Sequence, residues 1–169
     1  MMEVKTMELS DREEWLKLSR QYDKFIIEMG ADLRQWYNGN GKEDAFGDYM
    51  ERKISNKQAL MAVKEGACLG IAAFSFSNNS FSFFAVEGNA PFEQTARLLI
   101  SSVLSRLDTS REVTVNIMKS RALLIERQRE VFRAFGFEKI EGEFIENGVK
   151  MEKWRVKNTA FSLPCLINL

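Results

Sequence analysis

The sequence predicts one α/β domain, residues 1–157, whose mixed, mostly antiparallel sheet is flanked by helices on both faces. A chain of 169 residues suits a single domain. Apolar residues repeat with the 3.6-residue period of helices in some segments and alternate or run together, as in strands, in others. In chain order these segments give β-α-α-β-β-β-α-β-α-β-β. A strand-helix-strand crossover follows the antiparallel strands and must place its two strands parallel in the same sheet.

The N-terminal part predicts a strand and a long helix. Residues 4–9 alternate weakly between polar and apolar and are expected to form a short strand. Ser10 and Glu13 have the spacing of a capping box, so we expect a helix over residues 10–29 that ends at Gly30. The apolar face of this helix would consist of Trp15, Leu18, Tyr22, Phe25, Ile26 and Met29.

The middle of the chain predicts a helix, a strand meander and a further helix. Residues 43–54 carry apolar side chains at helical spacing. The stretches 59–64, 68–76 and 81–86 are separated by turn-forming residues, so they are expected to form three antiparallel strands. Residues 92–107 show one apolar helical face after a proline, which fits the start of a helix because its missing N–H costs little there.

The C-terminal part completes the sheet. Residues 112–118 alternate as a strand, and residues 121–135 have an apolar helical face. Two further strands, 137–145 and Val149–Val156, flank an Asn-Gly pair, which is a strong hairpin signal. The tail at 158–169 is apolar and is expected to cover either the core of this chain or a partner.

The crossover also indicates where a ligand would bind. In open α/β sheets ligands prefer the carboxyl ends of strands at the point where neighbouring strands diverge. Here that point is the end of the strand 81–86 and the start of the helix at Phe92.

The composition excludes several classes of function. The chain has no histidine, so it has no Ser-His-Asp or Cys-His nucleophile pair, and no metal site is predicted. Lys and Arg balance Asp and Glu at 24 each, which gives no electrostatic signal for nucleic acid or an anionic membrane. Cys68 and Cys165 match no disulfide or zinc pattern, and no signal peptide or membrane span is evident. We therefore expect a cytoplasmic protein.

Some short motifs resemble a known family. Residues 131–137, Val-Phe-Arg-Ala-Phe-Gly-Phe, look like the closing helix and Gly-Phe strand entry of the GNAT superfamily of acyl-CoA-dependent N-acetyltransferases. Leu69-Gly70-Ile71 is similar to a strand of that family, and Phe84, Ala85 and Val86 resemble the end of its fourth strand. The predicted element order matches the family over nearly the whole domain.

The resemblance implies a ligand set. It implies acetyl-CoA or another acyl-CoA as co-substrate and a small-molecule or peptide amine as acceptor, with a homodimer as one arrangement. In family members the backbone at the end of the fourth strand pairs with the pantetheine arm, which here corresponds to Phe84, Ala85 and Val86. The following helix start would receive the pyrophosphate on free amides. The residues at that start are Phe92, Glu93, Gln94, Thr95, Ala96 and Arg97.

The sequence departs from the family at the expected catalytic positions. The two glycines of the phosphate loop are absent from residues 90–95. Phe132 stands where many members have a tyrosine that protonates the leaving thiolate, and Ile125, or Arg121, stands where they have an asparagine. Catalytic residues therefore remain unassigned. Two main hypotheses follow, an acyltransferase that uses water to carry protons, or a catalytically inactive domain that binds a ligand or a protein. A non-GNAT enzyme on a similar sheet is a third.

Other charged residues and one cysteine have two readings each. The basic clusters Lys119-Ser120-Arg121 and Arg127-Gln128-Arg129 are either solvated or placed to meet the adenosine phosphate of CoA. Cys68 is expected to be a small buried hydrophobic residue rather than a nucleophile. Four carboxylates near the first two helices are either solvated or close to an amine, and these are Asp32, Asp44, Asp48 and Glu51.

Overall fold

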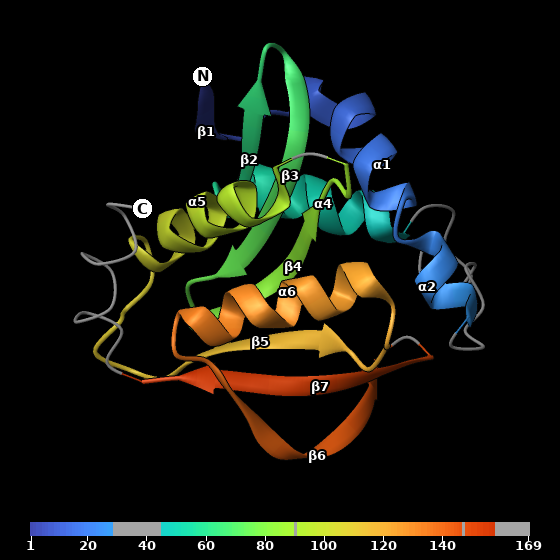
Figure 1. Cartoon of the computed structure of the whole chain (residues 1–169). Helices are drawn as coiled ribbons and strands as arrows, with labels where there is room; N and C mark the ends of the chain where they lie inside the picture. The colour runs from blue at the N-terminus through green and yellow to red at the C-terminus, as the bar shows by residue number, and fades with distance from the viewer. Residues whose placement is uncertain (29–44, 90, 147, 158–169) are drawn as a thin grey trace.

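The computed structural model describes residues 1–28, 45–89, 91–146 and 148–157 and has a seven-stranded sheet in the order β1-β2-β3-β4-β5-β7-β6 (Figure 1). All neighbouring strands are antiparallel except β4 and β5, which are parallel as the crossover predicts. The predicted Gly30 stop, Asp32, Asp44 and the tail at 158–169 lie outside the described residues. The strands are β1 (Met2–Thr6), β2 (Ala59–Lys64), β3 (Ala67–Ser75), β4 (Ser80–Val86), β5 (Val113–Met118), β6 (Glu138–Glu146) and β7 (Val149–Val156).

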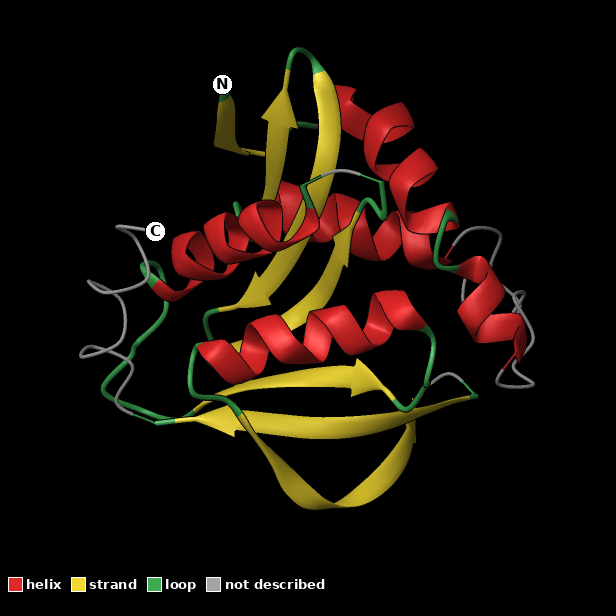
Figure 2. Ribbon diagram, viewed as in Figure 1, coloured by secondary structure: helices red, strands yellow, loops and turns green. Residues whose placement is uncertain are grey.

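Helices cover both faces of the sheet (Figure 2). On one face α5 crosses β2 and β3, and α6 lies along β5 (Figure 1). On the other face α1 and α4 meet through Trp15 and Phe46, and Phe46 reaches Phe83 of β4. The described helices are α1 (Arg12–Arg20), α2 (Asp23–Glu28), α4 (Ala45–Ser55), α5 (Phe92–Leu104) and α6 (Leu123–Ala134), with a short 3-10 helix at Leu9–Asp11. The prediction of a mixed α/β sheet with helices on both faces is confirmed.

The prediction of one continuous helix over residues 10–29 is wrong. The helix breaks between α1 and α2 at Gln21 and Tyr22, and the amides of both residues bond carbonyls three positions earlier. The capping box predicted for Ser10 and Glu13 is also wrong. Instead the Glu8 amide donates to Asp11 Oδ2 at 2.8 Å, because the Asp11 carboxylate, held by Lys5 at 3.1 Å, lies closer to the start of the turn.

The first strand begins and ends earlier than the predicted residues 4–9. Met2–Thr6 pairs with β2, and the Met7 amide still bonds the Ala59 carbonyl at 2.9 Å before the chain turns. The remaining predicted elements agree with the structure within a few residues at their ends.

Strands β4 and β5 meet at one end and diverge at the other. The two strands pair where Ser80 of β4 lies beside Thr114 of β5. At the closed end the buried Asn79 side chain donates to the carbonyls of Asp108 and Glu112, both at 2.9 Å, and accepts from the Asp108 amide. These bonds join the β3–β4 turn to the loop before β5 and so fix the point from which the strands diverge.

The core extends between the sheet and both helical layers. Phe81 and Phe84 of β4 pack edge-on against Phe132 of α6, and Phe137 closes the same cluster. Each of these rings is buried. Among the described helices none is long and apolar enough to cross a membrane.

Candidate active site

A narrow cleft lies where β4 and β5 diverge; it includes Phe84 of the predicted strand end, but no residue of the predicted helix start at Phe92 lines it. Its volume open to the centres of water molecules is about 40 Å³, which holds roughly three waters. Walls come from both strands, from α6, from the hairpin end of β6 and from the α1–α2 junction. The lining residues are Tyr22, Ser82, Phe83, Phe84, Asn116, Met118, Ile125, Gln128, Glu146 and Met151.

The end of β4 forms one wall of the cleft. Ala85 and Val86 are fully buried and Phe84 nearly so. The Glu87 amide bonds the Leu69 carbonyl on β3 at 2.8 Å. Because backbone groups alternate in direction along an antiparallel strand, those of Phe84 and Val86 face away from β3, toward the cleft.

A tyrosine hydroxyl already occupies this edge. The Val86 amide donates to Tyr22 Oη at 2.8 Å, and Tyr22 Oη donates to the Val86 carbonyl at 2.8 Å. Tyr22 is 3% exposed, and burial raises the pKa of its phenol well above the usual value. It therefore stays protonated and able to donate. The sequence assigned Tyr22 to a helical apolar face and did not indicate this contact.

The start of α5 adjoins the open end of β4. Phe92, Thr95 and Ala96 are buried, with the Thr95 hydroxyl bonded to the Pro91 carbonyl at 2.9 Å. Among the predicted pyrophosphate residues Glu93 and Gln94 are exposed and Arg97 is half-buried. Side chains at this helix start thus pack inward or face solvent, so an anion would meet the backbone amides of the first turn.

The charges around this helix start partly cancel. Arg97 donates through Nε and Nη2 to Glu93 Oε1 at 3.1 and 2.9 Å, so the Glu93 carboxylate has a cationic partner. From α6 the Arg127 guanidinium lies 4.6 Å from the centre of the Phe92 ring. Arg127 is therefore the cation of its basic cluster that lies beside the α5 start.

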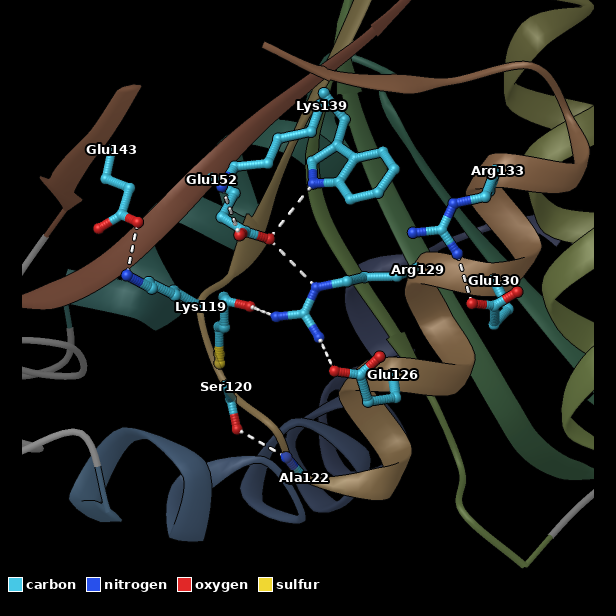
Figure 3. A network of polar contacts seen from close by, with 12 residues as sticks. Lys119, Ser120, Ala122, Glu126, Arg129, Glu130, Arg133, Lys139, Glu143 and Glu152 are labelled. Atoms are coloured by element: carbon cyan, nitrogen blue, oxygen red, sulfur yellow. Dashed lines mark hydrogen bonds and ion pairs between the residues drawn. The ribbon is translucent and has the colours of Figure 1, made fainter. Parts of the chain in front are cut away.

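Arg129 of the same cluster serves the fold. Buried Arg129 of α6 bonds Glu152 Oε1 of β7 at 3.1 Å, Glu126 Oε1 at 2.8 Å and the Met118 carbonyl at 2.7 Å (Figure 3). Lys119 pairs with Glu143 of β6. Buried Arg129 is therefore not free to meet a CoA phosphate, whereas the Lys119 ammonium stays at the surface beside Glu143.

Glu152 is the centre of this network. Burial acts to raise its pKa, but hydrogen bonds from Lys139 and Arg129 outweigh burial and hold the pKa of the carboxyl below its usual range. The Trp154 indole Nε1 also donates to Glu152 Oε1 at 3.5 Å. The network ties α6, which forms one wall of the cleft, to the sheet.

The position of the missing tyrosine is closed to solvent. Phe132 is fully buried, with its ring 5.0 Å from Phe84 and 5.3 Å from Phe81. It offers no proton and no access. Ile125, at the position of the family asparagine, lines the cleft, whereas the alternative Arg121 is exposed.

Polar side chains from four elements converge at the cleft on the face away from α6. Asn116 Nδ2 of β5 donates to Glu146 Oε2 of β6 at 3.2 Å. The phenol of Tyr49 on α4 lies near Ser82 of β4, and burial raises the pKa of Tyr49 to about 12, with Glu146 adding to the rise. We call Tyr49, Ser82, Asn116 and Glu146 the polar cluster.

The sequence assigned no catalytic role to any residue of the polar cluster. Strand alternation does place Asn116 and Glu146 on one face of their strands, but nothing local shows that these faces meet. Of the carboxylates that the sequence did single out, the two described ones, Asp48 and Glu51, do not line the cleft. Asp48 is exposed, and Glu51 bonds Arg12 at 2.8 Å.

Cys68 is a buried residue of β3, as the sequence predicts. Its Sγ lies 3.6 Å from the Gly70 carbonyl. Burial raises the pKa of the thiol to about 12, so the reactive thiolate is scarce at neutral pH.

Solved acetyltransferase structures share this fold. A GNAT-family acetyltransferase from Bacillus cereus ATCC 10987 is 18% identical with a TM-score of 0.63, over 93% of this chain and 97% of that chain. YncA from Salmonella typhimurium, solved with its cofactor acetyl-CoA, is 12% identical with a TM-score of 0.61, over 94% of each chain. The PaiA N-acetyltransferase from Thermoplasma acidophilum, in complex with coenzyme A, is 11% identical with a TM-score of 0.64, over 90% and 98%.

The sequence itself gives the family. No curated protein matches it. The model of the acetyltransferase (GNAT) domain matches residues 30–157, which is most of the chain. The chain therefore belongs to the GNAT acetyltransferase domain family.

Proposed function

We propose that this protein transfers an acyl group from acyl-CoA to an amine, in the cleft between β4 and β5. The observation that carries the proposal is the divergence of these strands beyond Ser80 and Thr114, which leaves the backbone of Phe84 and Val86 without a partner strand on this side. Family membership supports the same reaction, as do the acetyl-CoA and CoA bound to similar structures.

The β4 edge suits a thioester. In the reaction the amine nitrogen attacks the thioester carbonyl, the C–S bond breaks, and the thiolate leaves while the nitrogen loses a proton. The Phe84 and Val86 backbone groups face the cleft, so an N–H on this edge can donate to the carbonyl oxygen as it gains negative charge. Ala85, between them, packs its backbone toward β3 and keeps the edge in register.

The start of α5 suits the pyrophosphate. Amides in the first turn of a helix without a side-chain cap point outward and attract anions. Glu93 opposes this, but Arg97 balances its charge, and Arg127 adds a cation beside Phe92. The exposed residues Glu93 and Gln94 would border the phosphates, while the buried Phe92, Thr95 and Ala96 hold the turn in place.

The polar cluster suits the amine. Glu146 is a carboxylate at the cleft, oriented by Asn116, so it can hold an ammonium group and accept the proton that the nitrogen loses. Tyr49 and Ser82 extend the polar wall beside it. This assigns to Glu146 the base that the sequence left unassigned.

The carboxylate of Glu146 favours an amine as the acceptor. We propose a small-molecule or peptide amine, in a cytoplasmic protein where acyl-CoA is available. A homodimer stays a prediction. No contact among the described residues favours the alternative of a binding domain without catalysis, because the cleft is lined by groups suited to transfer.

Isothermal titration with acetyl-CoA tests the proposal first, and we expect saturable binding. Release of CoA thiol from acetyl-CoA is then measured with a panel of primary amines that includes spermidine and a lysine peptide. An absence of binding at millimolar acetyl-CoA would overturn the proposal.

A further inference from the structure

The hydroxyl of Tyr22 takes the place of a neighbouring strand on Val86. It accepts from the Val86 amide and donates to the Val86 carbonyl, each at 2.8 Å, across 64 positions of sequence. A single side chain thereby satisfies both backbone groups that a paired strand, or an extended ligand, would satisfy.

The Tyr22 hydroxyl satisfies backbone groups of Val86 that would otherwise be buried without hydrogen-bond partners. Val86 is fully buried, and β5 has already diverged from β4 at this level. Buried backbone groups without partners are strongly disfavoured. With Tyr22 in place the Val86 edge is complete, and any ligand that pairs with Val86 must replace the same two hydrogen bonds.

The space in the cleft points the same way. With Tyr22 bound to Val86, about 40 Å³ is open to water centres, enough for roughly three waters and too little for an extended thioester arm. Tyr22 itself lines this space, opposite Ile125 and Gln128 of α6.

The position of Tyr22 in the chain permits a local movement. It lies between the end of α1 at Arg20 and the start of α2 at Asp23, outside both helices. Its ring packs edge-on against Phe25 at 5.6 Å. Displacement of the hydroxyl therefore requires rearrangement of a short junction and leaves the bonds inside each helix in place.

We propose that Tyr22 competes with acyl-CoA for the backbone of Val86 and is displaced when acyl-CoA binds. This rests on the proposed function, since it assumes that acyl-CoA uses the β4 edge. The competition weakens acyl-CoA binding and couples it to the α1–α2 junction.

Isothermal titration of acetyl-CoA into wild type and Tyr22→Phe tests the competition. The variant keeps the ring but leaves the Val86 groups unsatisfied until the ligand arrives, so we expect acetyl-CoA to bind about 10-fold more tightly. Ser19→Ala is the matched control. It also removes a buried hydroxyl from this region, one that bonds the Leu16 carbonyl and not β4, and its affinity should equal that of wild type.

A measurement on the wild-type protein covers the case in which Tyr22→Phe does not fold. The NMR signal of the ¹³Cζ-labelled Tyr22 ring should shift when saturating acetyl-CoA is added, because the hydroxyl loses both partners. An unchanged Tyr22 signal in the acetyl-CoA complex would overturn the inference.

The titrations separate a failure of the Tyr22 competition from a failure of the proposed acyltransferase function. Equal or weaker binding by Tyr22→Phe, with wild type binding normally, overturns the competition alone. If wild type, Tyr22→Phe and Ser19→Ala all fail to bind acetyl-CoA, both the competition and the proposed function are overturned.

Discussion

Asn116 Nδ2 of β5 donates a hydrogen bond to Glu146 Oε2 of β6 at 3.2 Å. Strand β7 lies between β5 and β6 in the sheet, so this bond spans β7. The bond brings the carboxylate of an outer strand to the centre of the sheet, where β4 and β5 diverge. A carboxylate thus reaches the cleft even though β4 itself carries none.

Replacement of this carboxylate should abolish most turnover. Glu146→Gln keeps the size of the side chain but cannot accept a proton, so we expect the rate of acetyl transfer to fall roughly 100-fold, with acetyl-CoA affinity unchanged in titration. Glu138→Gln, at the other, exposed end of β6, is the control and should retain full activity. Full activity in Glu146→Gln would exclude Glu146 as the base.

Gly70 on β3 should not tolerate a side chain. A Cβ at this position would lie 2.7 Å from Leu99 Cδ1 and 3.0 Å from Thr95 Cγ2, both buried on α5. We expect Gly70→Ala to lower the free energy of unfolding by about 1–3 kcal/mol, measured by urea denaturation. Gly88→Ala, where the new Cβ would meet Leu124 at an ordinary 3.7 Å, should change stability by less than about 0.5 kcal/mol. Similar losses in both variants would contradict the prediction.

The Glu152 network should make stability depend on pH. The pKa of Glu152 is lower in the folded protein than the unfolded value near ~4.3. Its contribution is therefore complete above the unfolded pKa and is lost as pH falls through the folded pKa. Glu152→Gln removes the buried carboxylate partner of Arg129, which keeps only the exposed Glu126, and should cost about 3 kcal/mol at pH 7.

Urea denaturation of wild type and Glu152→Gln from pH 7 to pH 3 measures this dependence. The difference in free energy between the two proteins should shrink below about pH 4. Glu130→Gln, which removes an exposed pair with Arg133, should cost under about 0.5 kcal/mol at any pH. A constant difference for Glu152→Gln across this range would be inconsistent with a lowered pKa.

The thiol of Cys68 should be unreactive in the folded protein. Its pKa of about 12 and its burial leave little thiolate for alkylation at pH 7.5. Iodoacetamide labelling, followed by peptide mass spectrometry to separate Cys68 from Cys165, should modify Cys68 in urea and hardly at all in buffer. Rapid labelling of Cys68 in buffer would show that β3 opens readily.

The fold was predictable where local pattern and tertiary packing agree. The strand-helix-strand crossover through α5 follows from periodicity and handedness alone, and it correctly makes β4 and β5 parallel. The helix break at Tyr22 was not predictable. Trp15, Leu18, Tyr22 and Phe25 keep a helical period across it, and all four are buried as the period requires. At the break the Tyr22 hydroxyl bonds the backbone of Val86, a residue distant in sequence.

The sequence indicated where in the sheet the candidate site lies, but it did not indicate which polar side chains line it. The divergence of β4 and β5 indicated a position for the cleft, and Phe84 lines it. The polar cluster, by contrast, joins side chains from α4, β4, β5 and β6. The pairing register does not align them, since Asn116 lies opposite Lys153 and Glu146 opposite Val149 on β7. The basic clusters show the reverse case, since Arg129 looked like a surface cation and is buried among carboxylates.

The bonds of Arg129 also bear on how the cleft can widen. They fasten α6 to β7 and to the end of β5, so the wall carrying Ile125 and Gln128 is rigidly braced. On the opposite side the Val86 backbone is held by the Tyr22 phenol, and the other contacts with β4 include the ring pair Phe46–Phe83. If the cleft widens, we therefore expect the α1–α2 junction to move, while α6, β5 and β7 keep their positions.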